Sequence, residues 1–313
     1  MVETMSGGFQ HEAFLYADRD EFLEGTSRFV RDGVSFGEPT LVVVDTAKIT
    51  ALRRALGSAS AHVQFLDMAA VGRNPARIIP AWRGFIDAHG AGDRPVRGIG
   101  EPMWAERTPE ELVECRLHEA LLNVAFAESG SFRLLCPYNT ATLDPVVIEQ
   151  AHGTHPVVCT TDRRYASPSY AGLDTSALFS EPLTAPPASA ERLRFTTLGP
   201  VRDTVRRYVD AAGLAPTATA DAVLAVNEVA TNSLRYGGGH GTLTVWRADD
   251  TLLCQVTDRG RISDPLVGRR APAVRDPGGR GLWLANQTCR LVQIRSADEG
   301  TTMRLHFPGG SIT

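Results

Sequence analysis

The sequence of 313 residues lacks the features that mark several large classes of protein. It has no run of like charges and a formal net charge of −4, whereas binding to nucleic acid or to an anionic membrane surface needs clustered basic side chains. We therefore expect no direct contact with nucleic acid or membrane. Residues 1–10 have no charged segment followed by an apolar core, and no apolar run approaches the roughly 18 residues of a membrane span, so neither a signal peptide nor a membrane helix is predicted.

Cysteine is scarce as well. The five cysteines are scattered, odd in number and never spaced as CxxC: Cys115, Cys136, Cys159, Cys254 and Cys289. This usage favours a reduced, cytoplasmic protein. The rest of the composition, 43% hydrophobic and 22% charged, is that of a globular protein, and at about 150 residues per domain the length predicts two domains.

The first predicted domain, residues 8–158, alternates short β-branched runs with longer amphipathic segments. The predicted strands are residues 40–45, 62–66, 96–99 and 132–136, and the predicted helices are residues 20–31, 47–56, 75–88 and 109–128. This alternation is typical of an α/β fold in which helices cover both faces of a mostly parallel sheet. Ligands in such sheets bind beyond the carboxyl ends of the strands, so the turns after the strands are candidate sites.

These turns lack the phosphate-binding sequence GxxxxGK[ST], so we expect no ATP site of that kind in this domain. They offer instead Glu101 and Trp104 after one strand, and Cys136 and Tyr138 at the end of another. A carboxylate, an indole, a thiol and a phenol suit a small, partly apolar ligand. The alternative is structural: Trp104 and Tyr138 close the core, and Cys136 is a small buried hydrophobe.

The predicted helix 109–128 carries Cys115 and His118 three residues apart, and hence on one face. They could form half of a metal site that Cys136 or His11 completes, although two ligands alone do not define a site. The pair His118 and Glu119 also resembles the phosphoacceptor sequence of two-component histidine kinases. That sequence lies on a long helical hairpin, however, whereas here the flanking segments are predicted strands.

Three blocks of this domain resemble the MEDS (DcmR-like) sensory domain: GEPMW at residues 100–104, ECRLHEALLN at residues 114–123 and LLCPY at residues 134–138. The resemblance spans nearly all of residues 8–158 and implies a RecA-like fold without a working P-loop. It also implies that the domain senses a small molecule or a redox change. The candidate sensory residues are Glu101, Trp104, Cys115, His118 and Cys136.

Residues 159–191 are rich in proline, which fixes φ and interrupts helices and strand ladders. The segment is predicted to be an extended, semi-rigid linker. For its first half the alternative is an irregular strap docked on one domain through Tyr165, Tyr170 and Phe179.

The second predicted domain, residues 192–313, begins with helices at residues 200–212 and 216–236. In the longer helix an apolar stripe is predicted at Val223, Val226, Ala230 and Leu234. Glu228 and Asn232, four residues apart, share roughly the opposite face. A solvated face would produce the same pattern, so this pair alone is a weak signal.

A hairpin is predicted from residues 242–247 and 252–258, and strands at 291–295 and 301–307 complete an antiparallel sheet. By period-2 alternation Leu252, Cys254, Val256 and Asp258 share one face, so Asp258 ends a buried stripe and needs a hydrogen-bond donor. The alternative is that Asp258 caps the following turn.

Residues 264–280 are rich in proline, glycine and arginine, a composition that suits a lid over phosphates. Gly279, Arg280, Gly281 and Leu282 then open an apolar helix. Glycine lets the backbone approach a phosphate closely, and the free N–H groups at the start of a helix favour anions.

The order Glu228…Asn232, Asp258-x-Gly260, Gly279-x-Gly281-Leu282 and Gly300-Thr301-Thr302 resembles the GHKL (Bergerat) ATPase superfamily, especially the serine kinases that act as bacterial anti-sigma factors. The resemblance covers about the last 120 residues and implies an α/β sandwich that binds ATP and Mg²⁺. It implies roles for individual residues: Glu228 as general base, Asn232 as Mg²⁺ ligand, Asp258 as partner of the adenine amine, Thr302 near the base, and Gly260, Gly279, Arg280, Gly281 and Leu282 around base and phosphates.

Two positions depart from that pattern. Tyr236 stands where many relatives have histidine, and Ile262 replaces the second glycine of DxGxG. A stiffer loop on the adenine side is expected to weaken nucleotide affinity.

The resemblances together imply a cytoplasmic serine/threonine kinase of the anti-sigma-factor type under the control of a sensory domain. The implied partners are a sigma factor and a STAS-type antagonist protein, with a small molecule at the first domain and a possible homodimer. One alternative is a nucleotide-sensitive binding switch without catalysis. Another is a sensor histidine kinase, which requires a dimerising phosphoacceptor hairpin that the sequence does not show.

Overall fold

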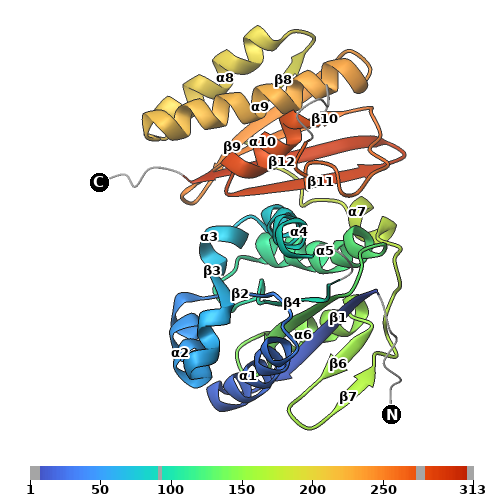
Figure 1. Ribbon diagram of the computed structural model, residues 1–313. Coiled ribbons are helices and arrows are strands. Elements are labelled where there is room, and N and C mark those ends of the chain that lie inside the picture. Colours follow the sequence, from blue (N-terminus) through green and yellow to red (C-terminus); the bar gives the residue numbers. More distant parts are fainter. Residues whose placement is uncertain (1–7, 91–93, 273–278, 309–313) are drawn as a thin grey trace. The chain divides into compact units, whose positions relative to one another are not determined.

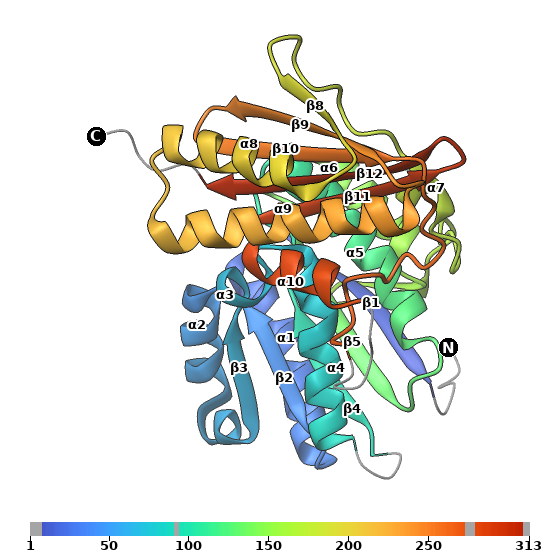
Figure 2. The ribbon, with the colours of Figure 1, turned by 90° about the horizontal axis from the view of Figure 1, so that it is seen from above.

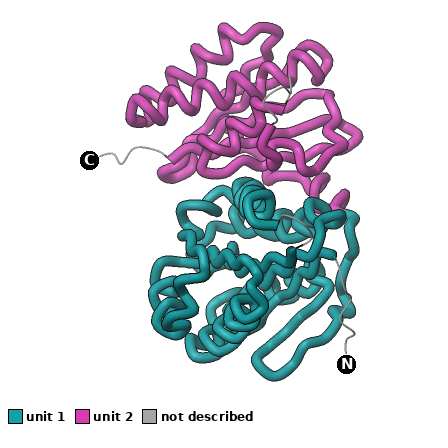
Figure 3. The backbone as a smooth tube through the Cα atoms, viewed as in Figure 1, with its two compact units in different colours: residues 1–174 teal, residues 175–313 magenta. Residues whose placement is uncertain are grey.

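The computed structural model describes residues 8–90, 94–272 and 279–308. The chain divides into two units, unit 1 with residues 1–174 and unit 2 with residues 175–313 (Figure 3). Among the described helices, none is at once long enough and apolar enough to cross a membrane.

Unit 1 is built on a seven-stranded sheet in the order β3-β2-β4-β5-β1-β6-β7. Neighbouring strands are parallel except β7, which runs antiparallel to β6. The strands are β1 Phe9–Tyr16, β2 Thr40–Val44, β3 Val63–Asp67, β4 Val96–Gly100, β5 Phe132–Asn139, β6 Val157–Cys159 and β7 Arg164–Ala166. The prediction of a mostly parallel α/β sheet is confirmed, while likeness to the RecA fold stays a prediction.

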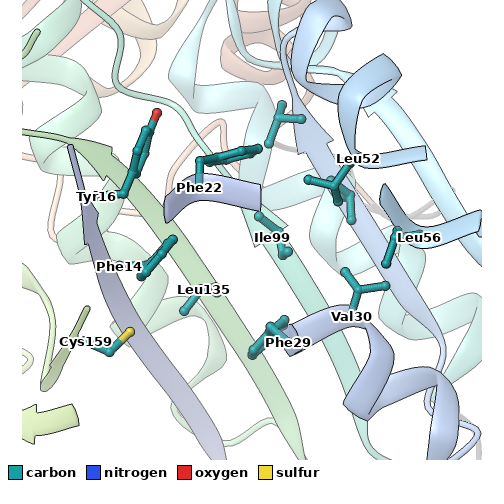
Figure 4. Close-up of a cluster of buried hydrophobic side chains, with 12 residues drawn as sticks. Phe14, Tyr16, Phe22, Phe29, Val30, Leu52, Leu56, Ile99, Leu135 and Cys159 are labelled. Atoms are coloured by element: carbon teal, nitrogen blue, oxygen red, sulfur yellow. The ribbon is translucent and has the colours of Figure 1, made fainter. Parts of the chain in front are cut away.

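Helices cover both faces of this sheet (Figure 1). The helices are α1 Arg19–Ser35, α2 Thr46–Leu56, α3 Met68–Gly72, α4 Ile78–His89, α5 Pro109–Phe126 and α6 Pro145–Thr154, with 3₁₀ turns η1 Gly57–His62 and η2 Pro75–Arg77. On the face of α1 and α2, Phe22 and Leu52 pack against Phe14, Ile99 and Leu135 of the strands (Figure 4). Helices α4, α5 and α6 lie on the opposite face.

The parallel direction of the strands brings several carboxyl ends to one edge of the sheet. Asp45 follows β2 and accepts a hydrogen bond from the backbone N–H of Lys48, which caps α2. Asp67 ends β3 and caps α3 in the same way, through Ala69. These caps hold the starts of both helices beside the turn that follows β4.

Unit 2 contains a five-stranded antiparallel sheet in the order β11-β12-β10-β9-β8. Its strands are β8 Glu191–Phe195, β9 Gly241–Ala248, β10 Thr251–Asp258, β11 Leu291–Ala297 and β12 Gly300–Pro308. Its helices are α7 Ser176–Ser180, α8 Leu198–Ala211, α9 Pro216–Tyr236 and α10 Arg280–Thr288. Figure 2 shows α8, α9 and α10 over one face of this sheet. The predicted hairpin is the pair β9 and β10.

The apolar side of α9 differs in part from the predicted stripe. Val226 and Ala230 are fully buried as predicted, but Val223 and Leu234 are only half-buried. The buried stripe is centred instead on the side that includes Val229 and Ser233, because that side of α9 faces the sheet.

The predicted linker is divided between the two units. Its β7 pairs with β6 in unit 1. In unit 2, α7 packs against β11 and buries Phe179. Tyr165 in β7 is 38% exposed.

Candidate functional site

One pocket of unit 2, of about 320 Å³, is formed where the end of α9, the end of β10, β12 and the start of α10 meet. Six of the residues predicted from the sequence line it: Asn232, Asp258, Gly260, Gly279, Gly281 and Leu282. They come from segments up to 50 residues apart in sequence, since α9 supplies the first and α10 the last. The arrangement is therefore a property of the tertiary structure and not of any single motif.

Asp258 is half-buried at the end of β10, below the buried face of Leu252, Cys254 and Val256. One carboxylate oxygen accepts a hydrogen bond from the Ser233 hydroxyl at 2.5 Å, and the other accepts from the Gly260 backbone N–H at 2.7 Å. The bond from Gly260 caps the turn that follows β10, which is the alternative role that the sequence allowed for Asp258. A carboxylate has about four lone-pair sites, so two remain for a donor in the pocket.

Glu228 and Asn232 lie one turn apart on α9, and both are half-buried. Neither side chain forms a hydrogen bond or an ion pair with a described residue. Glu228 does not line the pocket itself, but its carboxylate lies beside the first turn of α10. A Cβ atom at Gly281 would come within 2.7 Å of the Glu228 Oε2 atom, so glycine leaves the space that this carboxylate occupies.

The start of α10 has the backbone geometry of an anion site. Gly279 caps the helix with a φ of 81°, a left-handed conformation that favours glycine. The first backbone N–H groups of α10 are then without helical partners, and the helix dipole adds a partial positive charge there. Arg280 begins the helix and is exposed, while Leu282 is buried.

Thr302, which was also predicted to lie near the base, does not line this pocket. Thr301 lines the pocket, and its hydroxyl donates to the Gly260 carbonyl at 2.8 Å. Thr302 points to the other face of the sheet, where its hydroxyl lies 3.4 Å from that of Thr257. Side chains alternate across a strand, so a shift of one residue exchanges the two faces.

Both departures from the superfamily pattern lie in the pocket. Tyr236 and Ile262 are among its lining residues. The Ile262 backbone N–H donates to the Ser296 hydroxyl at 2.9 Å, which ties this loop to β11. The predicted lid, residues 264–280, includes residues 273–278, which lie outside the described residues.

Unit 1 holds a larger cavity, of about 570 Å³, at the carboxyl ends of its strands. Glu101, which follows β4, is one of the residues that line it. Both Glu101 oxygens lie 2.7 Å from the Lys48 Nζ atom, and the Tyr16 hydroxyl donates to Oε1 at 2.6 Å. Burial raises the pKa of Glu101 above its ordinary value, and the Lys48 ammonium opposes that rise. Trp104 also lines the cavity, with the Arg107 guanidinium 3.7 Å from its ring centre.

The other three predicted sensory residues do not line this cavity. Cys115, His118 and Cys136 are buried elsewhere in unit 1. Cys136 was expected at the end of its strand, but β5 continues to Asn139, so Cys136 lies within the sheet. Lys48 was not predicted from the sequence. It lies in the first turn of α2, directly after the turn that follows β2. Turns after parallel strands are candidate ligand sites, so this location was a usable signal.

Comparison with known proteins identifies both halves of the chain. The MEthanogen/methylotroph, DcmR Sensory domain (MEDS) matches residues 10–156, and the histidine kinase-like ATPase domain matches residues 192–307. A search of curated proteins finds no match.

Two of the solved structures that are similar to this chain match it over part of its length. The RsbU and RsbW domains of a Mycobacterium tuberculosis protein share 21% identity over 39% of this chain and 35% of that one, with a TM-score of 0.27. The chain thus spans about a third of that relative. The SiaB-SiaC complex from Pseudomonas aeruginosa shares 15% identity over 37% of this chain and 88% of the other, with a TM-score of 0.30. On the two family matches alone, the chain joins a MEDS domain at residues 10–156 to a histidine kinase-like ATPase domain at residues 192–307.

Proposed function

We propose that this chain is a cytoplasmic signalling regulator whose unit 2 binds ATP with Mg²⁺ and phosphorylates a serine or threonine of a STAS-type antagonist protein. In this proposal it also sequesters a sigma factor once the antagonist is phosphorylated. The observation that carries the proposal is the convergence of Asn232, Asp258 and the start of α10 on one pocket. The match to the histidine kinase-like ATPase domain supports it.

Each group has a chemical task in this proposal. Asp258 accepts the adenine amine through its remaining lone pairs, and Asn232 offers an amide oxygen to Mg²⁺, a hard cation that prefers oxygen ligands. The N–H groups at the start of α10 receive the phosphates. Glu228 removes the proton from the attacking hydroxyl, a task for which a carboxylate without internal partners is suited.

Affinity capture of the intact protein from its own cytosol, with and without ATP, provides the partner for the test. The captured protein is then incubated with labelled ATP, Mg²⁺ and either the wild type or Glu228→Ala. We expect transfer to a serine or threonine by the wild type and none by the variant. Undiminished transfer by Glu228→Ala removes Glu228 from the role of general base, and transfer to none of the captured proteins contradicts the kinase proposal.

A second candidate is a nucleotide-sensitive switch without catalysis. The position of Glu228 outside the set of lining residues, together with Ile262 in the pocket wall, favours this alternative. The same material separates the two proposals. Tight ATP binding that changes partner capture, with no label transferred, supports the switch.

We further propose that the cavity of unit 1 receives the signal, a small molecule that contacts Trp104 and the pair of Glu101 and Lys48. The wall combines apolar side chains with a few charged groups, as ligand sites commonly do. Candidate small molecules are screened by the shift they cause in thermal unfolding, with Trp104→Ala as the variant and Trp246→Phe of unit 2 as the control. A ligand that stabilises the wild type and Trp104→Ala equally contradicts this site.

A further inference from the structure

Four potential metal ligands meet in the core of unit 1, away from both sites described above. His11 lies on β1, Glu119 on α5, Cys136 on β5, and His155 directly after α6. Each is at most 1% exposed. One ligand atom from each residue lies within 4.8 Å of all the others. Residues separated by up to 144 positions thus bring two imidazoles, a thiol and a carboxylate together.

The hydrogen bonds around the cluster fix the tautomers of both histidines. The Asn123 amide group donates to the Thr154 carbonyl at 2.8 Å, so its oxygen faces the His11 Nδ1 atom, 3.1 Å away. An oxygen of this kind only accepts, so His11 carries a proton on Nδ1. His155 Nδ1 lies 2.9 Å from the Ala151 carbonyl and carries its proton for the same reason.

When both rings are neutral and carry their proton on Nδ1, each Nε2 presents a lone pair. Both lone pairs face the same Glu119 oxygen, at 3.0 Å from His11 and 3.2 Å from His155. His155 Nε2 and Glu119 Oε1 have no hydrogen-bond partner among the described residues. With neutral rings, three acceptors therefore converge in a buried space, an arrangement that is costly unless a proton or a metal cation lies between them.

We propose that His11, Glu119, Cys136 and His155 bind a divalent transition-metal ion, and that Zn²⁺ fits this donor set best. A tetrahedral Zn²⁺ ion, with bonds of about 2.0 Å to nitrogen and about 2.3 Å to sulfur, holds its ligand atoms roughly 3.3–3.6 Å apart. Cys136 Sγ lies 3.4 Å from His11 Nε2, close to this spacing. Histidine ligands commonly donate their other N–H to an oxygen, as both do here.

The site differs from the metal site considered from the sequence. That interpretation began from Cys115 and His118 on one face of α5. The structure uses Glu119 of the same helix and adds His155, whereas the Cys115 thiol donates to the Pro102 carbonyl at 3.4 Å. Cys115 is therefore a buried thiol of the same unit that lies outside the cluster, which makes it a matched control.

The test is metal binding by the full-length chain after chelation. Zn²⁺ affinity is measured by competition with a chromophoric chelator, and Co²⁺ is added as a spectroscopic probe. We expect one ion per chain and a thiolate-to-cobalt charge-transfer band in the wild type and in Cys115→Ser. In Cys136→Ser we expect loss of that band and a Zn²⁺ affinity at least about 100-fold weaker, beyond the roughly 10–100-fold effects of outer-sphere changes.

Three results would overturn the proposal. One is a wild-type chain that, although folded by circular dichroism, binds neither ion at micromolar concentration. This result would assign the cluster to a hydrogen-bonded network in which one imidazole is protonated. The second is a cobalt band that survives in Cys136→Ser. The third is loss of the band in Cys115→Ser as well, with both variants folded.

Discussion

Replacement of Asp258 by asparagine tests how the pocket of unit 2 recognises its proposed ligand, ATP. In the wild type, the Asp258 carboxylate accepts hydrogen bonds from the Ser233 hydroxyl and the Gly260 backbone N–H. In Asp258→Asn the amide oxygen can keep the bond from the Gly260 N–H, and the amide nitrogen can donate to the Ser233 hydroxyl, which also accepts. The internal hydrogen bonds are thus conserved in number, and we expect the free energy of unfolding to fall by no more than about 1 kcal/mol.

The effect on ATP is expected to be larger than the effect on folding. The variant has no negatively charged oxygen to accept a hydrogen bond from the adenine amine. The second N–H group of its amide faces that amine, which is itself a donor. A hydrogen bond to a charged group contributes about 1.5–3 kcal/mol. At about 1.4 kcal/mol per factor of ten, ATP affinity should fall about 10- to 150-fold.

The assay is a calorimetric titration of the full chain with ATP in the presence of Mg²⁺, accompanied by chemical unfolding of the same samples. Asp203→Asn serves as the control because this carboxylate belongs to the same unit and is 79% exposed. We expect its ATP affinity to match the wild type. Equal ATP affinity in Asp258→Asn and the wild type would refute the assignment of Asp258 to the adenine.

Two further predictions follow from buried contacts. Lys48→Met leaves the Glu101 carboxylate without its cation and should lower the free energy of unfolding by about 1–3 kcal/mol at pH 7. Burial already raises the folded-state pKa of Glu101 above its unfolded value. The loss of stability in Lys48→Met should therefore grow as the pH rises above the usual pKa range of a glutamate, where the carboxyl group must ionise, and shrink as the pH falls into that range, where it is protonated. Urea titrations at several pH values measure this dependence. Gly281→Ala should abolish phosphate transfer but keep ATP binding, since the new Cβ atom displaces the Glu228 carboxylate. Gly199→Ala, where the Cβ atom meets open space, is the control, and equal transfer rates in the two variants would contradict the argument.

The regular elements of the fold could be predicted wherever the periodicity of the sequence was uninterrupted. The bounds predicted for α9 are those of the structure, and the buried face of β10 is confirmed. Strand β1 was missed because His11 and Glu12 interrupt its apolar run. Both are buried, and Glu12 is paired with Arg133 and Arg164, but these partners lie more than 100 residues away and no local pattern indicates them.

Some residues of the candidate sites could likewise be placed from local patterns, and others could not. Asn232 and Asp258 could be placed by helical and strand periodicity together with the superfamily pattern. That Thr301 lines the pocket and Thr302 does not could not be predicted, because a motif gives an order of residues and not the face on which each lies. The cluster of unit 1 was beyond reach, since it depends on which side chains of four separate elements meet across the sheet, and His155 carries no local motif.

The Mg²⁺ dependence of ATP binding tests the central claim most directly. Asn232 lines the pocket, its side chain forms no hydrogen bond with a described residue, and it is the proposed ligand of the ion. Calorimetric titrations of the wild type and Asn232→Ala with ATP, in Mg²⁺ and in excess chelator, give four affinities. The account predicts that Mg²⁺ strengthens ATP binding to the wild type and has little effect on Asn232→Ala. Equal strengthening by Mg²⁺ in both proteins, or no ATP binding by the wild type, would contradict it.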